Sequence, residues 1–228
     1  MEHILLKISI MLVPALLAVT LHEVAHGFSA EKFGDPTARL LGRLTLNPLK
    51  HLDPIGTIAL LIFGFGWARP VPVNANNLRR PKNDMVWVAL AGPLANLMLA
   101  FFCALLLRVV VYVAASLPEA SHMLSYITPV GLMAAFGLYI NVILCLFNLL
   151  PIPPLDGGRV LMGILPEKQS LMLRRIEPFG LLLIVFLIFF TSIWSVAFGP
   201  AVDHVVSLMA GPHMGVVEQT KLLLFSRG

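Results

Sequence analysis

The sequence predicts an all-α membrane protein, a polytopic bundle of about four spanning helices with a re-entrant or strand-like segment between the first and second. Hydrophobic residues make up 58% of the chain and charged residues only 12%. The mean hydropathy of +0.87 lies outside the range of ordinary soluble domains. Four apolar segments are long enough to cross a bilayer, and a fifth is too short.

The long segments are predicted to be spanning helices because a helix needs about 20 mostly apolar residues to cross a hydrocarbon layer of about 30 Å. In chain order they are Ile4–Leu21, Met85–Ala115, Ile127–Leu150 and Phe179–Gly199. The short apolar segment Ile55–Gly66 would reach only about 18 Å as a helix. We therefore expect it to be re-entrant or strand-like and packed on protein, since backbone polar groups need partners at membrane depth.

We expect the chain to form a single domain, residues 1–228, because no internal repeat or low-complexity segment divides it. Its core is expected at about residues 4–160, followed by an additional helix at 179–199 and a tail at 200–228. Within the tail, Val202–Met209 is predicted to be a short interfacial helix. The N-terminal segment is expected to be a mature helix, because Glu2 precedes the lone Lys7 and no small-residue cleavage site follows.

The positive charge is concentrated in two loops, and this distribution predicts the orientation in the membrane. By the positive-inside tendency those loops are cytoplasmic, and the Ser116–Tyr126 loop, which has no Lys or Arg, is external. The net charge of +4 therefore indicates topology rather than nucleic-acid binding. The basic residues of the two loops are Lys32, Arg39, Arg43, Lys50, Arg69, Arg79, Arg80 and Lys82, and then Arg159, Lys168, Arg174 and Arg175.

The stretch LHEVAHGF at the end of the first apolar segment contains a motif of metal-binding residues. His22 and His26 are four apart, so on a helix their side chains share one face, one turn apart, close enough to bind one ion. Zinc suits imidazole, and the neighbouring Glu23 has a carboxylate that can take a proton from water. The alternative is that the two histidines are packed and hydrogen-bonded near a helix end.

The stretch FNLLPIPPLDGGR at the end of the third apolar segment supplies a candidate third ligand. The first and third segments both run inward, so their ends lie at the same side of the membrane. The prolines end the helix and the glycines permit a tight turn, which can aim Asp156 back at the histidines. The alternative is a plain helix-terminating turn. Asn148 can stabilise an oxyanion or tie helices together.

With these motifs the chain resembles the site-2 protease family of intramembrane zinc metalloproteases, peptidase family M50. The matching motifs are HEVAH, residues 22–26, and NLLPIPPLDG, residues 148–157. The stretches NPLKHLDPIG, GWARPVPVN and AGPLANL are also similar to its compact prokaryotic members without a PDZ domain. The resemblance covers about residues 16–159.

The resemblance implies a function and a role for each motif residue. His22, His26 and Asp156 would hold one zinc ion per chain, Glu23 would be the general base, and Asn148 would assist at the scissile carbonyl. It also implies a three-helix catalytic core made of the first three spans. The chain would then be a zinc-dependent endopeptidase of regulated intramembrane proteolysis, in a multi-pass cell-membrane protein with its active site toward the cytoplasmic side.

The expected partners are a membrane-protein substrate helix and the lipid bilayer, and not nucleic acid. A substrate helix must unwind locally to expose its carbonyls, and the stretch ARPVPVN could pair with it as an edge strand or be an ordinary loop. The principal alternative function is a metal-binding membrane transporter or sensor, in which Glu23 would more naturally be a ligand. A third is an inactive homologue, although all the motif residues are present. Gly92 is expected to allow close helix packing.

Overall fold

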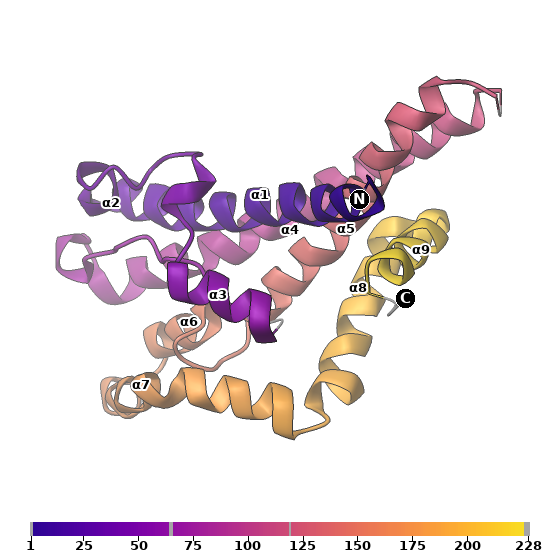
Figure 1. Cartoon of the computed structure of the whole chain (residues 1–228). Coiled ribbons are helices and arrows are strands. Elements are labelled where there is room, and N and C mark those ends of the chain that lie inside the picture. The colour runs from indigo at the N-terminus through magenta and orange to yellow at the C-terminus, as the bar shows by residue number, and fades with distance from the viewer. Residues whose placement is uncertain (1, 64–65, 119, 226–228) are drawn as a thin grey trace. The chain divides into compact units, whose positions relative to one another are not determined.

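The computed structural model describes residues 2–63, 66–118 and 120–225, and these form helices joined by loops (Figure 1). No strand occurs among these residues; one isolated antiparallel bridge joins Leu52 to Ala68. By length and hydropathy, three helices can cross a membrane. They are α1 (Glu2–Lys32), α4 (Pro81–Ala115) and α5 (Met123–Asn148). The prediction of an all-helical membrane protein is thus confirmed.

The fourth predicted span, Phe179–Gly199, is not one helix. Helix α7 (Glu167–Phe190) ends inside it, and helical structure resumes with the π-helix Trp194–Phe198. The Thr191 hydroxyl donates to the Leu187 carbonyl at 2.5 Å, one turn before the helix end. Thr191 itself has extended backbone. A fourth span therefore exists only if α7 and the helices after it count as one broken crossing.

The short apolar segment between the first two spans is helical over most of its length, so the strand-like prediction is wrong there. Helix α3 (Pro54–Phe63) begins with Pro54 and is capped by Asp53, whose Oδ1 accepts from the Gly56 amide at 2.8 Å. Residues 64 and 65 lie outside the described residues. A re-entrant path for this segment stays a prediction.

The chain groups into two compact units, and α1, α4 and α5 contribute residues to both. The first unit comprises residues 1–18, 96–144 and 193–228. It includes α8 (Gly199–Ala210), which contains the predicted tail helix, and α9 (Met214–Phe225). Whether the chain is one domain, as the sequence suggests, stays a prediction.

The first unit is held together by apolar packing and by a few polar contacts that are buried or partly buried. Asn96 donates to the Asn141 side chain at 2.8 Å, which links α4 to α5. Arg108 donates to the Met209 carbonyl at 2.6 Å, near the end of α8. On α4, the large apolar side chains of Phe101, Phe102 and Val109 are more than half exposed, at 54%, 58% and 58%. An apolar surface of this kind on a spanning helix suits contact with lipid.

The second unit comprises residues 19–95 and 145–192 and contains both motif stretches. Besides parts of α1 and α4 it includes α2 (Thr37–Leu40), α3, α6 (Asp156–Ile164) and α7, together with the 3-10 turns Pro48–Lys50 and Ala75–Asn77. Its loops are organised by Asp35, which is fully buried. The Asp35 carboxylate accepts from the Asn74 amide at 2.7 Å and the Asn77 side chain at 2.9 Å, which ties the loop after α1 to the segment before α4.

Candidate metal centre

Helix α1 places the two histidines of the HEVAH stretch side by side. His22 and His26 are both buried, each with 8% of its surface exposed. Because they are four residues apart on one helix, the two rings lie one turn apart, and their Nε2 atoms approach to 3.1 Å. The predicted sharing of one helix face is confirmed.

The orientation of the His26 ring is set by helix α4. Its Nδ1 lies 2.7 Å from the backbone carbonyl oxygen of Val88. A carbonyl only accepts hydrogen bonds, so Nδ1 carries the proton and, in the neutral ring, Nε2 presents its lone pair. A contact of this kind fixes the tautomer and direction of a metal-binding imidazole.

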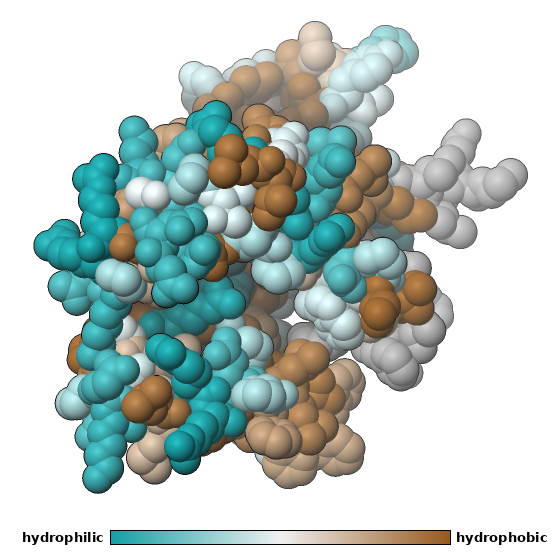
Figure 2. Space-filling view, turned by 90° about the vertical axis from the view of Figure 1, so that its left-hand side faces the viewer, coloured by the Kyte–Doolittle hydropathy of each residue, from teal (hydrophilic) through white to brown (hydrophobic). Residues whose placement is uncertain are grey.

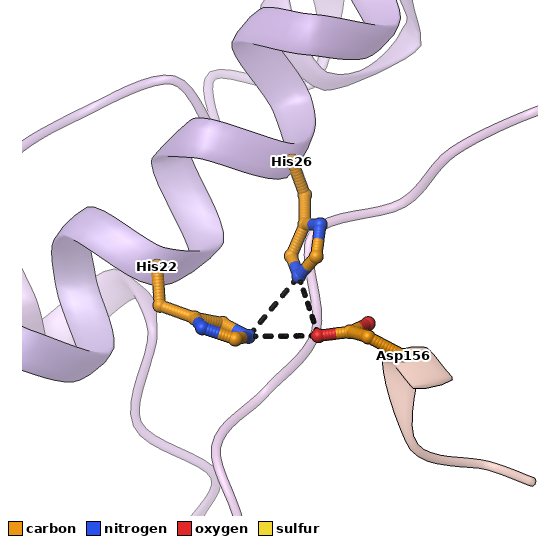
Figure 3. A group of neighbouring side chains, drawn as sticks. All are labelled: His22, His26 and Asp156. Atoms are coloured by element: carbon orange, nitrogen blue, oxygen red, sulfur yellow. Dashed lines mark hydrogen bonds and ion pairs between the residues drawn. The ribbon is translucent and has the colours of Figure 1, made fainter. Parts of the chain in front are cut away.

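Asp156 meets the histidines from the start of α6 (Figure 3). Its Oδ2 lies 3.2 Å from the Nε2 atoms of both His22 and His26. The preceding turn folds tightly, because Gly157 and Gly158 lie where a Cβ would come within 2.3 Å of the Leu149 carbonyl oxygen and 2.4 Å of the Pro153 nitrogen. The Pro153–Pro154 peptide bond in this turn is cis. The sequence prediction that the proline-rich turn aims Asp156 at the histidines is therefore correct in its geometry.

Glycine is required on α4 at the point where this helix faces the imidazoles. A Cβ on Gly92 would lie 2.3 Å from His26 Nε2 and 2.6 Å from His22 Cε1. Any side chain there would occupy the space beside the three converging atoms. The expected close approach at Gly92 is thus found, and it serves the histidines.

The donor set fits a metal ion. The ligand atoms of His22, His26 and Asp156 all lie within 4.8 Å of one another. In the described part of the chain, Asp156 Oδ2 is a buried atom without a hydrogen-bond partner. Two imidazole nitrogens and one carboxylate oxygen are ligands that zinc accepts, and three protein ligands leave a fourth position open.

The Asp156 carboxyl is held in its ionised form. Burial alone would raise its pKa, but His22 and His26, when they are protonated, outweigh burial and lower the pKa below its ordinary value. A negative charge next to two imidazoles strengthens the case for a cation at this point.

Glu23 lies beside this group but belongs to a different contact. Its side chain is buried, and its Oε2 accepts a hydrogen bond of 2.7 Å from the backbone amide of Val71. It is not a member of the group formed by the two histidines and Asp156. The carboxylate therefore remains free of the ligand set, next to the segment Pro70–Val73.

Asn148 is the last residue of α5 and is half-buried. Its role at a reacting carbonyl stays a prediction. Sequence reasoning did not identify Val88 and Val71. Val88 acts through its backbone carbonyl, which every residue has, and Val71 through its backbone amide, which every residue except proline has. A partial signal existed for Val71 alone, since Pro70 and Pro72 leave it as an isolated amide donor between them.

Comparison with known proteins gives a consistent result. The sequence matches the family model of peptidase family M50 over residues 10–130 and 111–191. It is 41% identical over 182 residues to a protein of Bacillus subtilis (strain 168) named "Putative zinc metalloprotease YwhC", and the match covers 80% of each chain.

More distant relatives have the same kind of name. The chain is 31% identical over 178 residues to "Putative zinc metalloprotease Rip2" of Mycolicibacterium smegmatis, covering 76% of this chain and 64% of the relative. It is 35% identical over 109 residues to "Putative zinc metalloprotease MJ0611" of Methanocaldococcus jannaschii, covering 47% of this chain and 49% of the relative. The chain thus spans less than two thirds of the length of these two relatives. No solved structure matches it.

Proposed function

Because the chain belongs to peptidase family M50, the site-2 protease family, we propose that it is an intramembrane zinc metalloprotease. Its substrates would be other membrane proteins, cut within or near their spanning segments in regulated intramembrane proteolysis. The observation that carries the proposal is the meeting of His22, His26 and Asp156 at 3.1–3.2 Å with Glu23 outside the group. A hydrolase needs both an ion and a carboxylate that the ion does not use.

His22, His26 and Asp156 are the residues that would hold zinc, one ion per chain. Zinc bound there would polarise the scissile carbonyl and lower the pKa of a water molecule towards about 7. Val88 supports this set by holding the His26 ring, and Gly92 supports it by leaving the space that the rings occupy.

Glu23 is proposed as the general base. Its carboxylate takes a proton from the attacking water and later gives that proton to the leaving amine, so the carboxylate is regenerated at the end of each cycle. The Val71 amide holds Oε2 at 2.7 Å. A carboxylate held in this way needs little reorganisation when the substrate arrives. Asn148 is proposed to donate to the developing oxyanion.

The substrate imposes a second requirement, because the carbonyls of a membrane helix are already hydrogen-bonded. We propose that the cut residues unwind first and that the reaction takes place toward the cytoplasmic side, where the basic loops predict the end of α1 to lie.

A metal-binding transporter or sensor is the alternative function. It would more naturally use Glu23 as a fourth ligand, whereas the Glu23 carboxylate bonds to Val71. An inactive homologue would be expected to lack one of the motif residues, and none is missing.

The test compares the purified wild type with Glu23→Gln in zinc content and in cleavage of a model membrane-helix peptide. Glutamine keeps the size of the side chain and can still accept from Val71, but it cannot take a proton. We expect both proteins to hold one zinc ion and only the wild type to cleave. Cleavage by the purified Glu23→Gln variant would show that another group is the base.

A further inference from the structure

A groove of about 660 Å³ lies in the second unit, next to the segment that contacts Glu23. One wall is the segment Pro70–Val73, and the others are the starts of α4 and α7 and one side of α6. Two of these walls are connected to the proposed active-site residues. Val71 donates its amide to Glu23, and Arg159 lies one helical turn after Asp156 on α6. Its size is that of an ordinary ligand site.

The groove is lined by apolar side chains and by five charged ones, which we call the rim. Val71, Met85 and Met162 contribute apolar surface. The cations of the lining are Lys82, Arg159 and Arg174, and the anions are Glu167 and Glu177. This is the polar end of the second unit: Figure 2 shows hydrophilic side chains gathered over the face at which the loops and the start of α7 lie.

These charges do not neutralise one another. None of the five side chains takes part in an ion pair among residues 2–63, 66–118 and 120–225. Lys82 donates to the Leu165 carbonyl at 2.6 Å. This bond uses one hydrogen of the ammonium group but does not neutralise its positive charge. On α7, Glu167, Ser170, Arg174 and Glu177 follow at intervals of three and four residues and so form one stripe on the helix.

The chemistry of the rim indicates the kind of occupant. A lipid headgroup would place its anionic group against the cations and leave Glu167 and Glu177 without an opposite charge. An apolar membrane helix would leave all five charges without solvent or partner. An extended peptide can place charged side chains against both signs of the rim and apolar side chains against the apolar part of the lining.

We infer that this groove binds the extended polar segment that flanks the substrate's spanning helix, and that it selects flanks in which Asp and Glu outnumber Lys and Arg. The inference rests on the proposed function, since the occupant is the substrate of the same site. Cations outnumber anions three to two in the lining. Cytoplasmic flanks of spanning helices are usually rich in Lys and Arg. A preference for acidic flanks would therefore restrict the substrates to a minority of membrane proteins.

Arg174 and its neighbour Arg175 provide a matched test. Both are exposed on α7, but only Arg174 lines the groove. Three peptides would share one apolar helix and differ only in an acidic, neutral or basic flank, and the full-length protein would be placed in zwitterionic lipid vesicles. We expect the wild type to cleave the acidic-flank peptide about fivefold faster than the basic one in kcat/KM, mainly through KM, because an exposed ion pair contributes at most about that factor.

Arg174→Glu should abolish or reverse this preference, and Arg175→Glu should keep it, with zinc content unchanged in both. Equal cleavage of the three peptides by the wild type, or the same shift in both variants, would overturn the inference. A preference that follows the anionic lipid content of the vesicles and not the flank would also overturn it, because the rim would then be a headgroup site.

A second measurement separates this inference from the proposed function. The three peptides, each labelled with a fluorophore, are titrated with the Glu23→Gln variant. Their binding affinities report on the groove without any cleavage. If no peptide is cut but the acidic flank binds best, the proposed function fails and the groove assignment stands. If peptides are cut but bind with equal affinity, the groove assignment alone fails.

Discussion

Replacing Gly92 by alanine should weaken zinc binding at the site while leaving the fold intact. The added Cβ would lie 2.3 Å from His26 Nε2 and 2.6 Å from His22 Cε1. An ordinary contact between such atoms is about 3.5 Å, so the rings or α4 must shift by about 1 Å. Metal sites need their ligands within about 0.5 Å of the working geometry. We therefore expect zinc affinity to fall about 10- to 100-fold, the size of effect seen when a metal ligand loses its support.

The assay is the rate at which zinc leaves the purified protein in the presence of a chelator, followed by metal analysis. Overpacking should also lower the free energy of unfolding by about 1–3 kcal/mol, offset by about 1 kcal/mol from the better helix propensity of alanine. Gly215→Ala on α9 is the control, because a Cβ at Gly215 meets no atom of the described residues within 4 Å. It should leave zinc loss unchanged.

The reasoning would be refuted if Gly92→Ala lost zinc no faster than the wild type or than Gly215→Ala. The methyl group would then be accommodated elsewhere, and the space beside the imidazoles would not depend on glycine. Helix content and the unfolding transition should be measured on the same samples. They distinguish a folded variant that loses zinc from one that loses zinc because it fails to fold.

Two further substitutions test neighbouring parts of the second unit. Asp156→Asn keeps the shape of the side chain but removes the charge from the histidine pair, so zinc should be lost to a chelator much faster than from the wild type; unchanged retention would remove Asp156 from the ligand set. Asp35→Ala should lower the free energy of unfolding by about 2–4 kcal/mol, since it leaves the Asn74 amide and the Asn77 side chain without their acceptor. Burial would raise the pKa of Asp35, but hydrogen bonds from Thr37, Asn77 and Asn74 outweigh burial and lower this pKa. The stabilisation by Asp35 should therefore be present above about pH 4 and disappear as the pH falls through the lowered pKa. Denaturant unfolding with the same pH dependence in Asp35→Ala and the wild type would contradict this.

The metal-binding residues could be predicted from sequence because their chemistry lies in side chains that are costly in apolar surroundings. His22, His26 and Asp156 stand out against the apolar segments that contain them, and their spacing relative to helix ends indicated that they meet. The groups that orient these side chains cannot be recognised in the sequence. Val88 contributes a carbonyl and Val71 an amide, and only the folded chain shows which of many identical backbone groups lies within 2.7 Å of the side chain.

The two errors in the predicted elements concern where helices begin and end. A run of about a dozen apolar residues does not distinguish a strand from a buried helix, and in Ile55–Gly66 the start signals of α3, Asp53 followed by Pro54, decide the matter. Near the end of α7 the hydropathy continues without change, but the helix ends at Phe190 and the backbone of Thr191 is extended. Hydropathy measures whether a segment suits lipid, and it carries no signal of this break.

Buried polar atoms without partners are not by themselves evidence of a metal centre in this chain. In the part of the chain that the structure describes, His51 Nδ1 and Arg43 Nε are also buried and without a hydrogen-bond partner. Neither belongs to a group of His, Cys, Asp or Glu side chains whose ligand atoms converge. Around Asp156, by contrast, a carboxylate oxygen faces two imidazole nitrogens at 3.2 Å, and Val88 fixes one nitrogen as an acceptor. Acceptors that face one another repel unless a cation lies among them, so it is their convergence, more than their burial, that argues for an ion.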